Sequence, residues 1–371
     1  MEESNKLLQE NIVLKKECFH ILWEHCVPYH PDTTEIPLQL HDIVEKKNTI
    51  GDYTIQKRLG SGTFANIHSC VVKHGSIAKH RYIVKQGTLG SLCHPASLDT
   101  QLAIKIIDKS KYIKFNHVKR LSNEIKALKL LKSTYITNIY DILHTKNNVY
   151  IVMDHGKDDL FKYIDGFPEG IEESVAKTIC KNLVVAIQFC HSRGVFHRDI
   201  KPENILMDSE TYHVVLCDFG LCKIIENTKT TRVSHEFLGS PGFFAPEIMD
   251  KELCPIEKID IWSAGVVIIE MLVGHDAFVD IWMKPYENLE EIKSKTFITT
   301  VHENLTKIFE LRSVSPSLRE LLIYIFTENP YERPGVNELL DSIWLKDVPI
   351  PPLNEKSSRP FSRRGSPSIS L

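Results

Sequence analysis

The chain has 371 residues, enough to bury a sizeable core and to fold as more than one lobe. Its 45 Lys and Arg face 48 Asp and Glu, and this near-neutral balance argues against a nucleic-acid or membrane surface. The nine Cys show neither CxxC pairs nor His partners at metal spacing, which favours free thiols in a reducing compartment over disulfides or zinc. With no signal peptide and no apolar run of membrane-spanning length, we expect a soluble protein inside the cell, in the cytoplasm or the nucleus.

Residues 5–24 have the pattern of an amphipathic helix. Leu7, Leu14 and Ile21 recur every seven residues, and further apolar residues widen the stripe. Three heptads without orderly flanking charges favour a helix packed on the rest of the chain, with self-association through this segment as the alternative. A proline-containing linker follows, so residues 1–49 are predicted to be an N-terminal extension.

Two strands joined by a glycine-containing turn are predicted at residues 53–72. Gly60 and Gly62 lack a Cβ atom, so the backbone N–H groups of this turn can approach a phosphate closely. From these residues alone, an ordinary hairpin that contains glycines remains the competing interpretation.

A long insert, about residues 73–101, follows this hairpin. It is basic and contains several glycines, which predicts a loop. A surface loop is the favoured interpretation, and a docking surface for an acidic partner is the alternative.

The next strand, residues 102–107, is apolar except for Lys105. A buried strand rarely contains a Lys without a partner for its charge. In the helix predicted after it, Glu124 shares one face with Leu121 and Leu128, because these residues are spaced by three and four. We therefore expect Glu124 to pair with Lys105.

Two short polar motifs contain the residue types needed for chemistry on a phosphate. The first is His197-Arg198-Asp199-Ile200-Lys201-Pro202-Glu203-Asn204, and the second is Asp218-Phe219-Gly220. Asp199 can accept a proton from a hydroxyl, and Lys201 supplies a point charge. Asn204 and Asp218 supply hard oxygen ligands, which suit Mg²⁺.

In order and spacing, these two motifs resemble the catalytic and metal-binding loops of protein kinases. The Lys-Pro-Glu-Asn loop and Gly239-Ser240-Pro241 are similar to serine/threonine kinases of the calcium/calmodulin-kinase and AMP-activated-kinase-like branch. The resemblance implies an α+β, two-lobed kinase domain over residues 50–346. A β-rich N-lobe would cover residues 50–153 and a mainly helical C-lobe residues 157–346, with a disordered Pro/Ser/Arg-rich tail over 347–371.

The resemblance also implies the cofactors and the site. ATP and Mg²⁺ are expected, with Asp199, Lys201 and Asn204 as catalytic residues and with Asn204 and Asp218 as metal ligands. The hinge at Asp154 and Gly156 would meet adenine through its backbone, and Asp159 would meet the ribose. The full set of nucleotide-binding residues implied is Leu59, Gly60, Ser61, Gly62, Ile67, Ala103, Lys105, Glu124, Asp154, Gly156, Asp159, Leu206 and Asp218.

Further motifs match structural positions of the same family. Asp260 would bind the backbone of the catalytic loop, and Arg333 would pair with Glu247. Ser240 would bond to Asp199. Because the third glycine of the family's loop pattern is Ala65 in this chain, we expect a stiffer phosphate loop that still contacts phosphate.

The resemblance implies a serine/threonine kinase acting on protein substrates. Glu203, Asp159 and Glu270 favour a basic residue before the acceptor hydroxyl, although each is also compatible with a purely structural role. A pseudokinase scaffold is the alternative function; the presence of Lys105, Asp199 and Asp218 argues against it.

Control of the activity is predicted to involve Arg198. Glu236 stands near the usual phospho-acceptor position of the segment after Asp218, and a carboxylate there would partly replace a phosphate. Ser234 is the competing candidate, as a true phosphorylation site. In the tail, Ser362 and Ser366 follow arginines and are candidate autophosphorylation sites.

Overall fold

The computed structural model describes eleven ranges of the chain. They are residues 49–62, 65–72, 101–111, 115–145, 147–156, 158–225, 232–233, 239–249, 254–287, 292 and 296–349. The predicted helix at 5–24, the insert up to residue 100, Ser234, Glu236 and the tail from residue 350 lie outside them.

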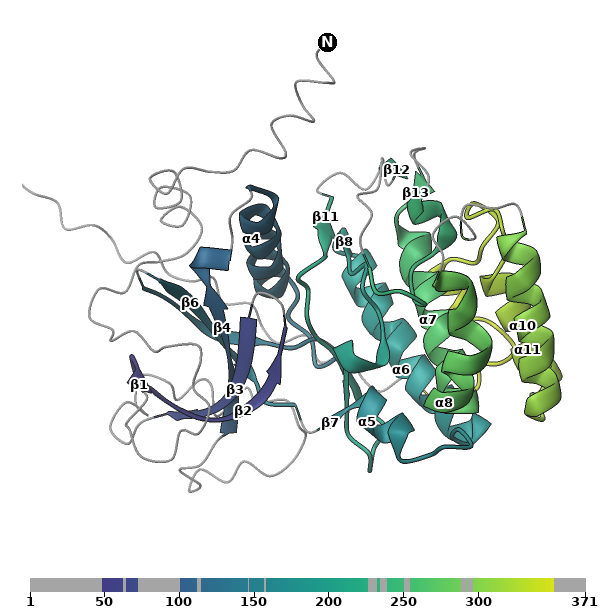
Figure 1. Cartoon of the computed structure of the whole chain (residues 1–371), viewed down its shortest axis with the longest axis horizontal. Coiled ribbons are helices and arrows are strands. Elements are labelled where there is room, and N and C mark those ends of the chain that lie inside the picture. Colours follow the sequence, from purple (N-terminus) through teal and green to yellow (C-terminus); the bar gives the residue numbers. More distant parts are fainter. Residues whose placement is uncertain are drawn as a thin grey trace, which may run out of the picture.

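The smaller lobe is a six-stranded antiparallel sheet in the order β1-β2-β3-β4-β6-β5 (Figure 1). Its strands are β1 Thr49–Ile50, β2 Tyr53–Ser61, β3 Ala65–Val72, β4 Gln101–Asp108, β5 Ile139–His144 and β6 Asn148–Asp154. One helix, α4, spans Phe115–Leu130 and packs on the sheet through Val118, Leu121 and Ile125, which join Ile107 and Ile151 in one apolar cluster. This cluster fixes α4 against β4, the strand that bears Lys105.

The larger lobe is mainly helical. Its helices are α5 Leu160–Asp165, α6 Glu173–His191, α7 Glu257–Val273, α8 His275–Phe278, α10 Phe297–Leu311, α11 Pro316–Ile325 and α12 Val336–Leu340. Short 3-10 helices are η1 Lys109–Lys111, η2 Pro202–Asn204, η3 Pro246–Met249 and η5 Lys284–Tyr286, and η4 Val279–Met283 is a π-helix. Figure 1 shows α6 and α7 in the middle of this lobe, with α10 and α11 on its outer side.

Helix α7 is apolar along nearly its whole circumference, which predicts a fully buried helix. In the structure every residue from Ile259 to Val273 is buried. Two of these buried residues, Asp260 and Glu270, are acidic. A buried carboxylate needs hydrogen-bond donors or a cation as partners.

Small sheets near the junction of the lobes hold the two loops that the sequence singles out. Strands β7 Asp158–Asp159, β9 Ile205–Met207 and β10 Val214–Leu216 form one of them, and β8 Val195–Phe196 with β11 Lys223–Ile224 forms another. The catalytic loop runs from β8 to β9, and the metal loop runs from β10 to β11. A further pair, β12 Arg232–Val233 with β13 Cys254–Pro255, lies beyond them.

The predicted elements of the site agree with the structure in type. The strand expected at 102–107 is β4, and residues 205–215 form the antiparallel pair β9–β10. The helix that bears Glu124 begins at Phe115, earlier than the residues from which it was predicted. Val118 lies three residues before Leu121 and is buried with it, so the apolar face of the helix extends toward its start.

Candidate active site

Lys105 and Glu124 form the predicted ion pair. Lys105 Nζ lies 2.6 Å from Glu124 Oε1, and the two side chains are 13% and 5% exposed. Lys105 lies opposite Ile67 of β3 and Ile151 of β6, so its position is fixed on both sides by the sheet. The pair therefore joins α4 to the sheet through a short, nearly dry contact.

Asp218 also faces this pair. Lys105 Nζ is 3.1 Å from Asp218 Oδ1, and the Asp218 side chain is 50% exposed. The Lys105 charge holds the pKa of Asp218 below its usual range, against the opposing effect of burial. Burial raises the pKa of Glu124, which the Lys105 charge counteracts. The Lys105 ammonium thus keeps Asp218 ionised at the mouth of the site and balances the charge of Glu124 inside it.

Asp199 is oriented by two neighbours from different segments. Asn204 Nδ2 donates to Asp199 O (2.8 Å) and to its Oδ2 (3.0 Å), and Ser240 Oγ donates to Asp199 Oδ1 (2.8 Å). Both carboxylate oxygens therefore accept a bond that limits rotation. Lys201 follows in the same loop, directly before η2, and is half-buried.

The backbone around Asp199 is anchored by Asp260 of α7. Asp260 is 1% exposed, and it accepts from His197 N (2.9 Å), Arg198 N (2.7 Å) and His191 Nε2 (2.7 Å). Arg198 has φ of +65°, a left-handed conformation that a side chain disfavours. The predicted binding of Asp260 to the catalytic loop is present, and it holds this strained residue next to Asp199.

The metal loop is tied to the catalytic loop. Asp218 has φ of +55°, Phe219 is fully buried, and the His197 ring meets the Phe219 ring edge-on at 4.7 Å between centroids. His197 Nε2 donates to Cys217 O (2.9 Å), while its Nδ1 accepts from Asp199 N (3.2 Å). Both ring nitrogens are engaged, so the imidazole has one defined tautomer and links the two loops.

The glycine turn lies at the end of hairpin β2–β3. Gly60 pairs with Ile67 and Ser61 with Asn66, and Gly62 N donates to Ala65 O (2.8 Å). A Cβ atom added to Gly60 would meet nothing within 4 Å, so the backbone there borders open space. Leu59, before the turn, is 40% exposed.

A pocket joins this turn to the rest of the site. Gly62 and Ala65 line one side, and Lys105, Glu124, Asp199 and Asp218 line the other. His117, Arg120 and Leu121 of α4 and Gly220 and Leu221 of the metal loop complete its wall. Groups from five separate segments of the chain thus face one space.

The expected hinge residues take different roles in the structure. The Asp154 carboxylate accepts from Asn138 N (2.9 Å), Asn138 Nδ2 (2.5 Å) and the Tyr140 hydroxyl. Asp154 N donates to Asn138 O (3.1 Å), so a ligand would meet the Asp154 backbone through its carbonyl. A Cβ atom added to Gly156 would lie 2.6 Å from Leu206 Cδ1, which explains why glycine stands opposite Leu206.

Asp159 and Ala103 flank the same region. Asp159 caps α5 by accepting from Lys162 N (2.8 Å), and it lies 3.4 Å from Lys162 Nζ. Its carboxylate is thus already engaged, a contact that the ribose prediction did not include. Ala103 is 5% exposed on β4, where its small side chain is typical of a flat apolar surface.

The donor set fits magnesium. Asn204 uses its Nδ2 on Asp199, which leaves its Oδ1 as an oxygen donor. Asp218, half-exposed, directly follows Cys217, whose N–H donates to Asn204 O (3.0 Å). Across the described ranges there is no group of three or more His, Cys, Asp or Glu able to hold a metal. Two protein oxygens with the remaining positions left to water and phosphate suit Mg²⁺, which keeps much of its hydration.

Away from the pocket, Arg333 and Glu247 form the predicted buried pair. Arg333 donates to both Glu247 oxygens, at 2.6 and 3.1 Å, and its guanidinium lies 4.8 Å from the centroid of the Trp262 ring. This bidentate pair joins η3, just after Ser240, to the C-terminal part of the lobe. It holds the shape of the segment and touches no reacting group.

The chain belongs to the protein kinase family. A sequence model of the protein kinase domain matches residues 85–345, which is more than half of the chain.

Among similar proteins are three plant kinases. CBL-interacting serine/threonine-protein kinase 15 of Arabidopsis thaliana is 32% identical over 281 residues, 74% of this chain and 63% of that protein. CBL-interacting protein kinases 2 and 10 of Oryza sativa subsp. japonica are 30% identical over 270 and 308 residues, covering 71% and 82% of this chain and 57% and 59% of those proteins. This chain therefore spans less than two thirds of their length. By its name, the first of them is a serine/threonine-protein kinase, the class that the motifs indicate.

Within the described residues, no helix has both the length and the apolar character needed to cross a membrane.

Some contacts were not foreseen from the sequence. His191 on Asp260 and the Asn138 and Tyr140 contacts to Asp154 come from segments with no recognisable motif. The sequence indicates a contact for His191 only weakly, because His191 is a polar residue at the end of the largely apolar helix α6. His275, which contacts Glu270, had no signal at all.

Proposed function

We propose that this chain is an ATP-dependent serine/threonine protein kinase. The observation that supports this most is the meeting of the Lys105–Glu124 pair, Asp218 and Asp199 around one pocket. In protein kinases the lysine–glutamate pair and the metal-binding aspartate must both be in place for transfer.

Each residue then has a defined task. Lys105 holds the α- and β-phosphates, with Glu124 fixing its position, and Lys201 neutralises charge at the γ-phosphate. ATP supplies the transferred phosphoryl group, and Mg²⁺, held by Asn204 and Asp218, neutralises its charge. Asp199 orients the substrate hydroxyl and accepts its proton.

The nucleotide lies between the lobes in this proposal. Ile67 and Ala103 cover adenine from the sheet side and Leu206 supports it from the other, while the Asp154 and Gly156 backbone meets its edge. The glycine turn, Leu59 to Gly62, covers the phosphates. Asp159 reaches the ribose only if it exchanges its bond to Lys162 N for one to a sugar hydroxyl.

Ser240 supports the choice of serine or threonine as acceptor. Its hydroxyl already donates to Asp199 Oδ1 at 2.8 Å, so a short aliphatic hydroxyl is accommodated next to this carboxylate. We therefore propose Ser or Thr side chains of proteins as substrates.

We further propose that a basic residue before the acceptor is preferred. Glu270 is 1% exposed and has a carboxylate oxygen with no hydrogen-bond partner, and the charge of Glu203 acts on it. A buried carboxylate with an unused oxygen beside a second carboxylate favours a cation such as a guanidinium. Asp159, engaged in capping α5, contributes less.

Phosphorylation of a positional-scanning peptide library tests both parts. The full chain should phosphorylate Ser and Thr peptides, and Asp199→Asn should reduce kcat by at least about a thousandfold. Asp280→Asn, a change of an exposed Asp remote from the pocket, is the matched control and should leave activity intact. A wild-type protein that binds ATP but transfers no phosphate would support the pseudokinase alternative.

A further inference from the structure

The buried carboxylate at the end of α7 is balanced by a single imidazole. Glu270 Oε1 lies 2.8 Å from His275 Nδ1, across the turn at Gly274. Glu270 Oε2 is buried and has no hydrogen-bond partner within the described ranges. A buried carboxylate oxygen without a donor is costly, and it marks this group as one that awaits a partner.

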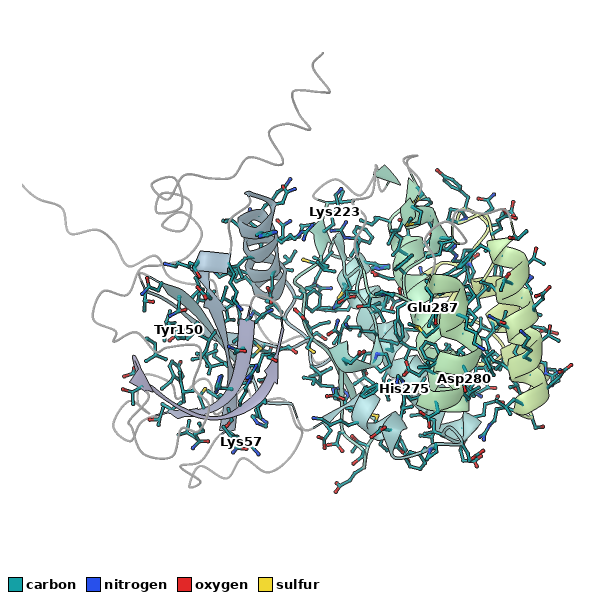
Figure 2. All side chains as sticks on the ribbon, viewed as in Figure 1. Lys57, Tyr150, Lys223, His275, Asp280 and Glu287 are labelled. Carbon is teal, nitrogen blue, oxygen red and sulfur yellow. The ribbon has the colours of Figure 1, made fainter. Side chains whose placement is uncertain are left out.

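The two members of this pair differ in freedom. The Glu270 side chain is 2% exposed and sits on a helix that is buried on all sides, whereas the His275 side chain is 38% exposed. The imidazole is held further only by an edge-on contact with the Phe161 ring, at 4.9 Å between centroids. Figure 2 labels His275 close to the start of α8. The imidazole can therefore rotate away, and the carboxylate cannot.

We propose that His275 is an internal stand-in for the substrate's cation at Glu270 and thereby determines how strongly a basic substrate residue is preferred. The imidazole covers the carboxylate until a guanidinium replaces it. Each occupant supplies an N–H donor to Glu270, so the exchange leaves no charge without a partner. The inference rests on the proposed function, because His275 can compete with a substrate cation only if the chain is a kinase with a site for a basic substrate residue.

Protonation controls this competition. Burial raises the pKa of Glu270 to about 7, an effect that His275 opposes and Glu203 reinforces. Below neutral pH Glu270 retains its proton and is neutral, and above neutral pH it loses that proton and becomes negative. A guanidinium is attracted more strongly by the negative pair, so the preference for arginine should increase with pH.

The other charged groups on the packed elements lie at the surface or pair with one another. Glu203 of η2 is exposed and its charge acts on Glu270. On α8 the neighbouring Asp276 is exposed, and at α5 Asp159 and Lys162 lie 3.4 Å apart as a pair of their own. The pH dependence near neutrality is therefore assigned to Glu270, with His275 as its contact.

The test compares two peptides that differ only by Arg against Gln at the position that the library identifies as basic. The ratio of their kcat/KM values measures the preference. For the wild-type chain this ratio should rise by about tenfold between pH 6 and pH 8, since Glu270 loses one proton over this interval. In His275→Asn the amide N still donates to Glu270 but no longer opposes the rise in the Glu270 pKa, so the rise of the ratio should move to higher pH and the ratio at pH 7 should fall below that of wild type.

Controls separate the role of His275 from the proposed kinase activity and its basic-residue site. Glu270→Gln should bring the ratio close to one at every pH, and His302→Asn, a histidine that contacts Phe326 O, should behave like wild type. Peptide affinity of the Asp199→Asn protein, measured by fluorescence anisotropy, gives the same ratio without turnover. An arginine preference that Glu270→Gln abolishes but whose pH profile is the same in His275→Asn as in wild type overturns the role of His275 alone. Absence of any arginine preference overturns the basic-residue site as well, and absence of phosphate transfer to any peptide refutes the kinase activity itself.

Discussion

Replacing Asp260 by Asn would test how the catalytic loop is held. The carboxylate accepts three donors on two oxygens, from His197 N, Arg198 N and His191 Nε2. An amide of the same shape has one accepting oxygen. If this oxygen faces His197 N and His191, the amide NH₂ is turned toward Arg198 N, which is also a donor.

The cost follows from these contacts. One charge-assisted hydrogen bond is lost, at about 1.5–3 kcal/mol, and the buried Arg198 N–H is left facing a donor. The left-handed Arg198 backbone, at φ of +65°, then relaxes by about 1 kcal/mol toward an ordinary conformation. We expect Asp260→Asn to lower the free energy of unfolding by about 2–4 kcal/mol. Because Asp199 follows Arg198, kcat should also fall by at least about tenfold.

Urea unfolding at pH 7, followed by circular dichroism, measures the first effect, and peptide phosphorylation measures the second. Burial tends to raise the pKa of Asp260, but bonding and charge from His191 and His197 together hold it below its usual range. The stabilisation is therefore present above about pH 4 and is lost as the pH falls further, so the difference between wild type and variant should shrink in acid. An Asp260→Asn protein within about 0.5 kcal/mol of wild type, with normal kcat, would refute this reasoning.

Three further changes test other buried charges. Lys105→Met should abolish phosphate transfer and lower the free energy of unfolding by about 2–4 kcal/mol, because Glu124 is left buried and unpaired. Adding Glu124→Gln should recover the stability but not the activity. Urea titrations measure the stability and kinase assays the activity, and any other pattern would contradict this reasoning. Arg333→Met should cost about 3–5 kcal/mol by stranding the buried Glu247, and a calorimetric melting temperature equal to that of wild type would contradict it. Between pH 5 and pH 8, the free energy of unfolding of Glu270→Gln should increase by up to about 3 kcal/mol relative to that of wild type, as measured by urea titrations. The reason is that the wild-type carboxyl has its pKa raised from 4.5 to about 7 and loses its stabilising proton over this interval. A difference that stays constant with pH would disprove this prediction.

The sequence was informative wherever chemistry and local pattern coincide. Lys105 in an apolar strand and Glu124 on an apolar helix face each required a partner, and the structure joins them at 2.6 Å. Glu247 and Arg333 could be paired only through the family resemblance, since 86 residues separate them along the chain. The start of α4 at Phe115 was not predicted, although Val118 precedes Leu121 by three residues and Ile125 by seven on the buried face.

Side-chain direction was the part that could not be predicted. The hinge prediction needed only the Asp154 backbone, and nothing in the local sequence indicates that its carboxylate turns to Asn138 and Tyr140. Asp159 was assigned to the ribose, yet an Asp directly before a helix also favours an N-cap, and in the structure it occupies that role. Such choices depend on tertiary neighbours, which a single sequence does not list.

The two acidic residues of α7 show why one buried carboxylate is assigned to structure and the other to specificity. Asp260 lies in the first turn, where the helix dipole favours an anion, and its oxygens receive three donors, so its pKa is lowered. Glu270 lies about 15 Å further along, in the last turn, where the dipole disfavours an anion. One of its oxygens has no donor, and its pKa is raised to about 7. A carboxylate that is fully satisfied only fixes its surroundings, whereas one that is unsatisfied, and covered by a half-exposed imidazole, retains the capacity to bind a cation from outside. The same buried helix thus holds the catalytic loop at one end and, in our proposal, selects the substrate at the other.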